Sequence, residues 1–174
     1  MERIYDFMTY DPKTYWNNRS NPTREEDILP EERAFFEPLI RDADLILDYG
    51  PGRGRLFELY RGKTVYGVDI TERYHIECVE TAMIYNVDYR WGVLQGKFDL
   101  GIVCKVLLHV PPDDIGPVIA DLADHCGKVA VLDIKTTRPL QEHNFSHDFE
   151  RLLENYTIHE WKKHDDQLKF VYSK

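Results

Sequence analysis

Short apolar runs alternate with amphipathic segments through most of the chain. Strands are predicted at residues 45–47, 65–68, 87–91, 98–103 and 129–134, several of them ended by Gly or Asp. Helices are predicted between most of these strands, because apolar residues there recur every three or four positions. Strands that alternate with helices favour a parallel sheet with right-handed crossovers.

A recognisable residue marks the start of each predicted helix, and the longer helices carry an apolar stripe that should face the sheet. A short helix is expected at residues 55–60. Thr71 is expected to cap a second helix, Pro112 to open a third and Ser146 to cap a fourth. The stripes of these three helices are, in order, Ile76, Val79, Ala82 and Met83; Ile115, Val118, Ile119, Leu122 and Ala123; and Phe149, Leu152 and Leu153.

The last two predicted strands form a hairpin. Residues 157–162 and 168–172 flank a polar Asp-Asp-Gln turn at residues 165–167. Such a hairpin adds an antiparallel edge to the sheet. The predicted fold is therefore α/β: a doubly wound, mostly parallel seven-stranded sheet with an antiparallel C-terminal edge hairpin and helices on both faces.

Residues 1–43 have a different pattern from the rest of the chain. Aromatic residues are interleaved with turn formers at residues 11–12 and 17–18, and the Pro-Glu-Glu sequence at residues 30–32 suits a first helical turn. We expect an irregular aromatic arm with one or two helices. The predicted organisation is a lid or arm over residues 1–43 and a single core over residues 44–174.

Composition and charge exclude several classes of protein. The 174 residues include 22 Lys and Arg against 31 Asp and Glu, a net charge of −9, which disfavours nucleic-acid binding. A hydrophobic content of 43% argues against disorder. The chain starts without an apolar leader, and no apolar run approaches the roughly 18 residues that cross a bilayer. Three cysteines without CxxC spacing suit buried reduced thiols, so we expect a cytoplasmic protein with no membrane partner.

A glycine-rich turn follows the first predicted strand. Residues 48–54 read D-Y-G-P-G-R-G, and glycines let the backbone turn sharply and approach a ligand without a Cβ in the way. Asp69 ends the second predicted strand, where a carboxylate can accept both hydroxyls of a ribose. Ligands of open parallel sheets bind at the carboxyl ends of the strands. Together the two features indicate an adenine-nucleoside cofactor.

The glycine spacing distinguishes between two kinds of nucleoside site. The dinucleotide fingerprint G-x-G-x-x-G/A requires a small residue where this chain has Arg55. The D-x-G-x-G-x-G pattern instead resembles motif I of the class I S-adenosylmethionine-dependent methyltransferases, in their small-molecule branch. The resemblance continues in order: residues 66–70 are similar to the second-strand motif, 98–104 to the fourth, 106–111 to the stretch that follows it and 127–133 to the fifth strand.

This resemblance implies an enzyme that binds S-adenosylmethionine (SAM), releases S-adenosylhomocysteine (SAH) and transfers a methyl group by in-line displacement to a small molecule. It implies that Asp69 binds the ribose and that Ile70 packs against the adenine. One departure is the stretch after the third strand, where many members of the family carry a Gly-Asp pair and this chain has Trp91-Gly92. Backbone groups or Trp91 would then meet the adenine edge, unless Trp91 is a plain core residue.

The acceptor side is less clearly marked. His109 follows the fourth strand and is the best-placed general base, needed only if the acceptor carries a proton at attack; a structural polar role is the alternative. Lys105, Lys135 and Arg138 also follow strands and motivate the hypothesis of an anionic acceptor, with solvated rim charges as the alternative. Residues 15–19 resemble a family segment that covers the cofactor, with aromatic rings near the sulfonium and a terminal Arg at the methionyl carboxylate; a packed arm without ligand contact is the alternative.

The sequence therefore predicts two groups of site residues and no metal site. The expected cofactor-binding residues are Asp48, Gly50, Pro51, Gly52, Gly54, Asp69, Ile70, Trp91, Gly92, Cys104, Lys105, Tyr15, Trp16 and Arg19. The expected acceptor-binding residues are His109, Lys135 and Arg138, with His109 also the catalytic candidate. Three alternatives stay open: an RNA or protein methyltransferase, a non-catalytic module with this fold, and a nicotinamide oxidoreductase, against which Arg55 argues. A homo-oligomer is compatible with the sequence.

Overall fold

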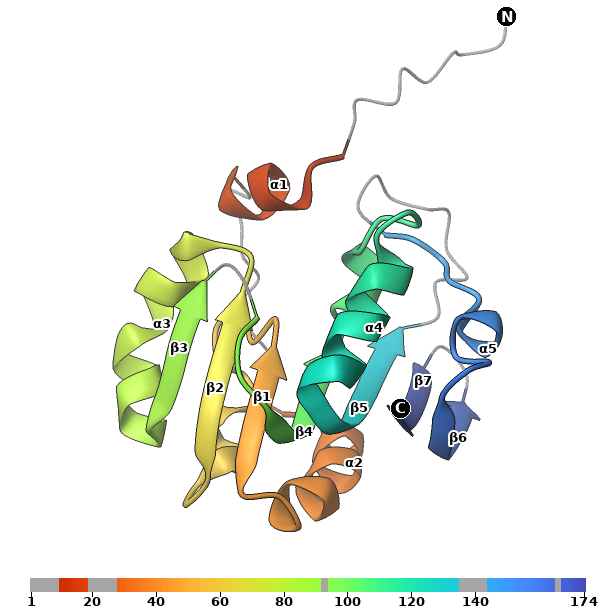
Figure 1. The fold of residues 1–174 in the computed structure, drawn as a ribbon. Helices are drawn as coiled ribbons and strands as arrows, with labels where there is room; N and C mark the ends of the chain where they lie inside the picture. The colour runs from red at the N-terminus through yellow and green to blue at the C-terminus, as the bar shows by residue number, and fades with distance from the viewer. Residues whose placement is uncertain (1–9, 19–27, 92–93, 135–143, 165–166) are drawn as a thin grey trace, which may run out of the picture.

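A seven-stranded sheet forms the centre of the molecule, with strand order β3-β2-β1-β4-β5-β7-β6 (Figure 1). The computed structural model describes residues 10–18, 28–91, 94–134, 144–164 and 167–174. The strands are β1 (Leu45–Tyr49), β2 (Thr64–Asp69), β3 (Val87–Trp91), β4 (Phe98–Cys104), β5 (Cys126–Ile134), β6 (Thr157–His164) and β7 (Gln167–Ser173). Strands β1 to β5 pair in parallel, and β7 runs antiparallel to β5 and β6. The predicted sheet and its antiparallel edge are confirmed.

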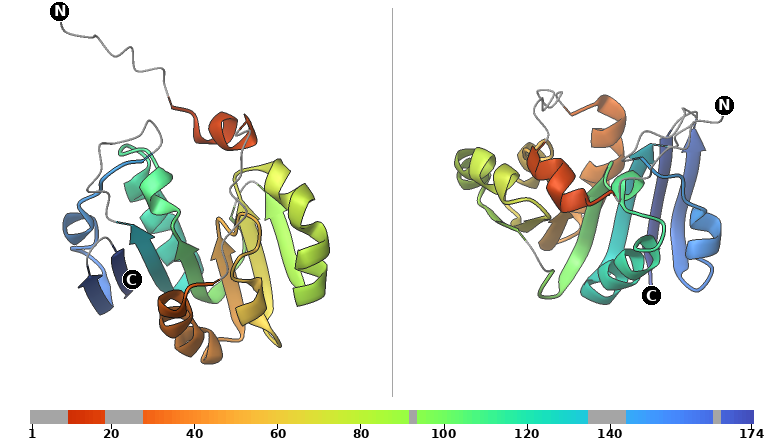
Figure 2. Two further views of the ribbon diagram at one scale, coloured as in Figure 1. Left: turned by 180° about the vertical axis from the view of Figure 1, so that it is seen from behind. Right: turned by 90° about the horizontal axis from the view of Figure 1, so that it is seen from above.

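Helices lie on both faces of this sheet, as predicted (Figure 2). The helices α2 and α3 and the short 3-10 helix η1 lie on one face, and α4 and α5 lie on the other. A further helix, α1, lies over the carboxyl ends of the strands. The bounds are α1 (Pro12–Asn18), α2 (Pro30–Arg41), η1 (Phe57–Tyr60), α3 (Glu72–Tyr85), η2 (Leu107–His109), α4 (Ile115–His125) and α5 (Phe149–Leu152).

The core has two apolar layers, one on each side of the sheet. Phe36 of α2 and Phe57 of η1 are fully buried in the first layer. Leu122 of α4 and Phe170 of β7 are fully buried in the second. Burial of a side chain of this size contributes about 1.5–3 kcal/mol relative to exposure. The two layers hold the strand ends, and therefore the residues that follow them, in fixed positions.

The connection from β3 to β4 is short for a parallel crossover. It must pass β2 and β1, which takes about 14 Å across the strands and about 20 Å along them, whereas the seven Cα steps available reach at most about 25 Å. Parallel crossovers usually need a dozen or more residues and contain a helix. Residues 92–97 are too few for one. Leu94, only 6% exposed, packs instead with Leu47 and Val68 in the α4-side layer.

The predicted apolar stripe of α3 is wrong at two positions. Ile76 and Met83 are 62% and 77% exposed, while Ala82 is buried and Tyr74 and Tyr85 pack against the core. The buried face of α3 is therefore rotated toward the tyrosines, and the side chain of Val79 is outside the described part. Apolar residues occur on both faces of this helix, so spacing alone did not determine which face is buried.

Three helix starts also differ from the sequence prediction. Helix α4 begins at Ile115 and not at Pro112. Asp148, not Ser146, caps α5, because its side chain accepts a hydrogen bond from the Arg151 N–H at 3.2 Å. The helix expected at residues 55–60 is shorter and is the 3-10 helix η1. Asp11, predicted in a turn, accepts hydrogen bonds from the N–H groups at the start of α1 and so begins a helix.

The cysteines that the structure describes are buried or half-buried. Cys126 is buried and Cys104 is half-buried, and neither forms a disulfide. Burial raises the pKa of both thiols to about 12, which keeps them in the unreactive thiol form. The side chain of Cys78 is outside the described part. None of the described helices combines the length and the apolar composition that a bilayer crossing requires.

Candidate active site

A cavity of about 630 Å³ lies at the carboxyl ends of β1, β2 and β4. It is lined by the turn after β1, the end of β2, the segment after β4, the start of α4, and α1. This volume is within the range of about 300–1,000 Å³ typical of small-molecule sites. The predicted site residues on its lining are Trp16, Asp48, Gly50, Pro51, Gly52, Asp69, Ile70, Cys104, Lys105 and His109.

The glycine turn forms one wall of the cavity. Gly50 and Gly52 have φ angles of 74° and 55°, in the left-handed region that glycine adopts without steric cost. The Gly50 N–H donates a hydrogen bond to the Val68 carbonyl at 2.8 Å. The Gly52 N–H donates to Asp69 Oδ2 at 3.1 Å. The turn after β1 is thus attached at two points to the end of β2.

Asp69 is held rigidly at the end of β2. Its Oδ1 accepts hydrogen bonds from the Thr71 N–H at 3.0 Å and from the Thr71 hydroxyl at 3.2 Å. The side chain is only 7% exposed, and this burial raises the pKa of Asp69 despite the opposing N–H donors. The carboxylate therefore has a fixed direction at the cavity, and it keeps the turn and the start of α3 together.

Asp48 is the acid of the glycine motif, and it is 2% exposed. Its Oδ2 accepts a hydrogen bond from the Tyr60 hydroxyl at 2.8 Å. Burial and the neighbouring carboxylate hold the pKa of Tyr60 well above its usual value, so the hydroxyl stays a donor. Asp48 thus lines the cavity from a position fixed by η1.

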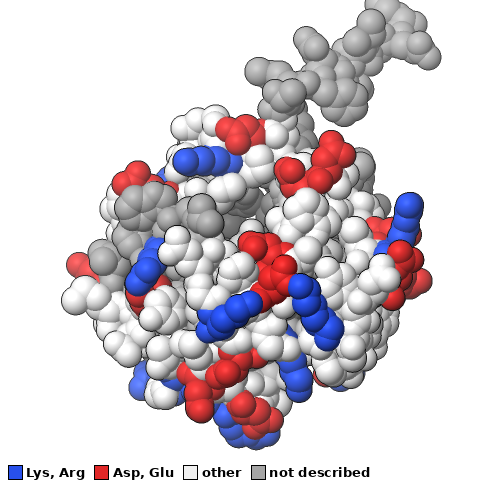
Figure 3. Space-filling view, viewed as in Figure 1, with Lys and Arg blue, Asp and Glu red and all other residues white. Residues whose placement is uncertain are grey.

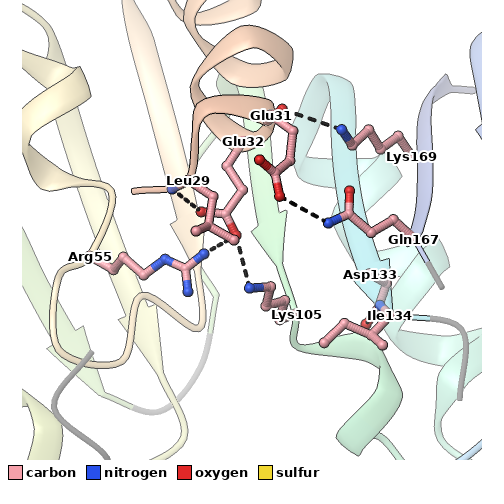
Figure 4. Close-up of polar contacts among 9 residues, drawn as sticks. All are labelled: Leu29, Glu31, Glu32, Arg55, Lys105, Asp133, Ile134, Gln167 and Lys169. Carbon is pink, nitrogen blue, oxygen red and sulfur yellow. Dashed lines mark hydrogen bonds and ion pairs between the residues drawn. The ribbon is translucent and has the colours of Figure 1, made fainter. Parts of the chain in front are cut away.

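Lys105 and Arg55 share a buried acid, Glu32 (Figure 4). Lys105 Nζ lies 2.9 Å from Glu32 Oε1, and Arg55 Nη2 pairs with the same oxygen. Glu32 is fully buried in the first turn of α2, and both cations line the cavity. Neither Glu32 nor Arg55 was predicted as a site residue from the sequence, because nothing in the local pattern places α2 beside the glycine turn.

Aromatic rings lie at the α1 side of the cavity. The Trp16 ring makes an edge contact with the His109 ring, with centroids 4.8 Å apart, and lies 6.4 Å from the Tyr74 ring. Tyr15 packs on Trp16 and Tyr10, at 5.1 and 5.6 Å, and does not line the cavity. Helix α1 therefore contributes one tryptophan to the site and is supported by tyrosines behind it.

The segment before α4 and the first turn of that helix add a mostly apolar wall that was not predicted from the sequence. Its lining residues are Val110, Pro111, Asp114, Pro117 and Val118. The sequence signal for this wall was weak, because Val118 also fits the core-facing stripe of the helix.

Several predicted site residues have no described side chain. Arg19, Gly92, Lys135 and Arg138 lie outside the described residues. Trp91 pairs with Asp69 in the sheet register, but its side chain is outside the described part. The last glycine of the motif, Gly54, is buried against Phe57 and does not line the cavity.

Asp133 is the last residue but one of β5 and supports the segment that carries His109. Its carboxylate accepts hydrogen bonds from the Leu108 N–H at 3.0 Å and the Ile134 N–H at 2.8 Å. It is 2% exposed, and burial raises its pKa to about 7. Ionising this group in the folded protein therefore costs free energy that the unfolded chain does not require.

We expect the variant Asp133→Asn to gain stability relative to the wild type as the pH rises. A carboxyl whose pKa is raised on folding destabilises the folded state once the pH exceeds its pKa in the unfolded chain, here 3.8. The cost grows until the pH exceeds its pKa in the folded protein. From pH 5 to pH 8 the difference in unfolding free energy should grow by about 3 kcal/mol in favour of the variant. Urea unfolding of both proteins at the two pH values measures it. A difference that does not change with pH would contradict a raised pKa at this position.

The fold of this chain is similar to the folds of several solved structures. No protein-family model matches the chain, and the comparison with curated proteins gives no match either. The magnesium protoporphyrin IX methyltransferase of Synechocystis PCC 6803 with bound SAH is similar with a TM-score of 0.68 at 17% identity, over 93% of this chain and 98% of that one. The PH0226 protein of Pyrococcus horikoshii OT3 has a TM-score of 0.70 at 23% identity, over 92% and 98%.

A third similar structure is the 1,6-didemethyltoxoflavin-N1-methyltransferase of Burkholderia thailandensis, with a TM-score of 0.69 at 21% identity, over 92% of this chain and 84% of that one. The chain has the class I methyltransferase fold. Within that fold, the glycine turn, Asp69 and the segment after β4 lie at the carboxyl edge of the sheet, where open α/β sheets bind ligands.

Proposed function

We propose that this protein is a SAM-dependent methyltransferase that acts on a small molecule. The observation that carries the proposal is the hydrogen bond from the Gly52 N–H to Asp69, which joins the glycine turn and the strand-end acid at one cavity. Two of the similar structures contain SAH, and a further structure of the Synechocystis enzyme contains SAM. The fold alone does not establish an activity, so the proposal depends mainly on the residues of this site.

The residues of the cavity fit such a cofactor. Asp69 would accept the ribose hydroxyls, and Ile70, which is 46% exposed beside it, offers an apolar surface to the adenine. Asp48, Cys104 and Lys105 line the cavity nearer to β4, where the amino-acid part would lie. When bound, SAM supplies an activated sulfonium methyl group for in-line displacement.

The protein's own contribution is alignment and exclusion of water. Orientation alone can be worth about 7–11 kcal/mol in well-aligned systems. Trp16 and Pro12 of α1 line the cavity together with the apolar wall of α4, which leaves space for an acceptor beside His109. In this proposal residues 1–43 form the lid of the core, and His109 accepts the acceptor's proton where there is one.

A small acceptor is favoured over RNA or protein. The acceptors for which the similar enzymes are named, magnesium protoporphyrin IX and 1,6-didemethyltoxoflavin, are small molecules. The cations near the glycine turn have partners within the fold: Arg61 lies over the Tyr85 ring, and Lys63 donates to two carbonyls at the end of α2. On the face shown in Figure 3, Lys and Arg are interspersed with Asp and Glu. An anionic acceptor has less support than the sequence suggested, because Lys105 faces Glu32.

Calorimetric titration of the purified protein with SAH, with NAD as the control, tests the cofactor. We expect SAH to bind at micromolar concentration and NAD not to bind, because Arg55 stands where a dinucleotide site requires a small residue. Binding of NAD alone would favour an oxidoreductase. Absence of binding by either compound would favour a non-catalytic module.

His109→Asn tests the proposed base once an acceptor has been found by screening. For an acceptor that carries a proton, we expect kcat to fall by about 10²- to 10⁴-fold, with SAH affinity unchanged within about threefold because other residues hold the cofactor. The wild-type pH dependence of kcat should lose its acidic limb in the variant. Unchanged kcat would assign His109 to packing against Trp16.

A further inference from the structure

Strand β3 is the last strand at one end of the sheet, and β6 is the last at the other (Figure 1). An edge strand presents backbone N–H and C=O groups with which another strand can pair, so proteins usually protect it with lysines, prolines or bulges. Strand β6 has such protection, because it carries Lys162 and Lys163 and a bulge interrupts its register with β7. The five residues of β3 include no lysine and no proline, and their register with β2 runs unbroken from Val87 to Trp91. Among the residues that the structure describes, the edge of β3 is therefore open to another strand.

The charges on β3 are complementary to those of a second copy of the same strand. Asp88 and Arg90 lie on the same face of the sheet, where Arg90 Nε donates to Asp88 Oδ1 at 3.0 Å and the guanidinium lies over the Tyr66 ring of β2 at 5.5 Å. The two side chains are 44% and 61% exposed. In an antiparallel pair of β3 strands with a two-fold axis at Tyr89, Asp88 of each copy lies opposite Arg90 of the other. The four side chains then form a square of alternating charge.

The same charges disfavour the neighbouring registers. A two-fold axis at Asp88 would place the two aspartates opposite each other, and an axis at Arg90 would do so with the two arginines. Like charges directly opposite each other destabilise a strand pair, whereas opposite charges stabilise it. The axis at Tyr89 is therefore the one that this pattern of charges selects.

Such a pair also brings together two apolar helix surfaces. Helix α3 packs on β3, with Ala82 and Val87 in the same core layer, and its outer face carries Ile76, Met83 and Ile84. These side chains are 62%, 77% and 76% exposed, more than the other large aliphatic side chains that the structure describes. A two-fold axis perpendicular to the sheet keeps both α3 helices on one face and makes them antiparallel. Paired strands are about 4.8 Å apart and packed helices about 8–10 Å, so helices over the two paired strands are within contact range.

We infer that the protein forms a two-fold homodimer in which the β3 strands of two copies pair antiparallel about Tyr89, joining the two sheets into one. The pairing supplies backbone hydrogen bonds between the strands, two Asp88–Arg90 ion pairs between the copies, and contact between the α3 helices. The described lining of the cavity contains no residue of β3, so each copy keeps an accessible site. The inference goes beyond the proposed function and does not depend on it.

Sedimentation velocity at a series of protein concentrations measures the association. We expect the wild type to form a dimer, twice the 20.6 kDa of one chain, at micromolar concentration, as suits a small interface. Asp88→Arg and Arg90→Asp each place like charges opposite each other at both contacts of the two-fold. The dissociation constant of each variant should therefore rise about 10- to 100-fold.

A mixture of the two variants tests the register itself. One variant carries two positive charges on β3 and the other carries two negative charges, so their heterodimer has opposite charges at both contacts. The equimolar mixture should therefore associate at least as tightly as the wild type, which general damage to the strand would not produce. Lys162→Glu is the matched control, because Lys162 pairs with Glu160 at 2.8 Å on β6, two residues apart as on β3. It should leave the association unchanged.

Three results would overturn the inference. They are a wild type that stays monomeric at every micromolar concentration, a dimer that neither charge reversal weakens, and a mixture of folded variants that does not associate. Circular dichroism shows beforehand that the variants are folded. If one of them is not, hydrogen exchange of the wild type decides: the amides of residues 87–91 should exchange more slowly as the protein concentration rises, and exchange that does not depend on concentration overturns the inference.

Discussion

Replacing Asp69 with alanine is expected to lower SAH affinity by about 150-fold, or about 3 kcal/mol, the largest effect on binding in this site. A hydrogen bond to a charged group contributes about 1.5–3 kcal/mol, and the ribose offers two hydroxyls. The substitution also removes the acceptor of the Gly52 and Thr71 N–H groups, so the glycine turn loses one of its two attachments to β2. Calorimetric titration with SAH measures the loss.

Two further variants separate binding chemistry from general damage. Asp69→Asn keeps one acceptor oxygen and should lose less affinity than the alanine variant. Because burial raises the pKa of Asp69, wild-type affinity should fall as the pH is lowered through that pKa, and the asparagine variant should lack this dependence. Asp88→Ala is the control, since Asp88 lies on β3 and pairs with Arg90 away from the cavity. If Asp69→Ala bound SAH within threefold of the wild type, the ribose assignment would be wrong.

Replacing Gly54 with alanine is expected to cost about 2–5 kcal/mol of stability. Gly54 has φ of 78°, and an added Cβ would lie 2.5 Å from the ring of Phe57, which is fully buried. The left-handed backbone costs a non-glycine residue about 1–2 kcal/mol, and overpacking a buried site adds about 1–3 kcal/mol. Urea unfolding followed by circular dichroism measures the change.

The chain contains two glycines that separate these costs. Gly62 has φ of 77°, but no atom lies within 4 Å of an added Cβ. Gly62→Ala should therefore lose only the stability that the left-handed backbone conformation costs a non-glycine residue. Gly116 in α4 has neither problem, and Gly116→Ala should gain about 0.5–1 kcal/mol because alanine favours the helix. Equal losses at Gly54 and Gly62 would show that Phe57 moves away at little cost.

The buried strands β1, β2, β4 and β5 were predictable because each contains a short apolar run, and some have a clear end, such as Asp69 at the end of β2. The face of α3 was not, because Ile76 and Met83 are apolar but exposed, and a pattern cannot distinguish such residues from core residues. The start of α5 was placed two positions too early, because Ser146 and Asp148 are both of residue types that cap helices. These errors are local, and none of them changes the order of the strands.

Some of the site residues could likewise be predicted from the sequence, and others could not. The glycine turn and Asp69 could be placed from the sequence, because strand ends in a parallel sheet meet at one edge. Glu32 could not, because a glutamate in a first helical turn normally indicates only capping. Its partners Arg55 and Lys105 are distant in the sequence, and so is His109 from Trp16. Such pairs depend on how the arm and helices pack, which local patterns do not encode.

The short crossover between β3 and β4 also determines where this fold can be enlarged. With a single connecting chain in place of a helix, Leu45, Tyr49 and Tyr66 remain only half-buried on that side of the sheet. A longer insertion between these strands would find an apolar surface on which a new helix could pack. Deletions there are different, because each residue removed shortens the reach by about 3.5 Å in a connection with almost no slack. Between β3 and β4 the chain therefore has room to gain residues but almost none to lose.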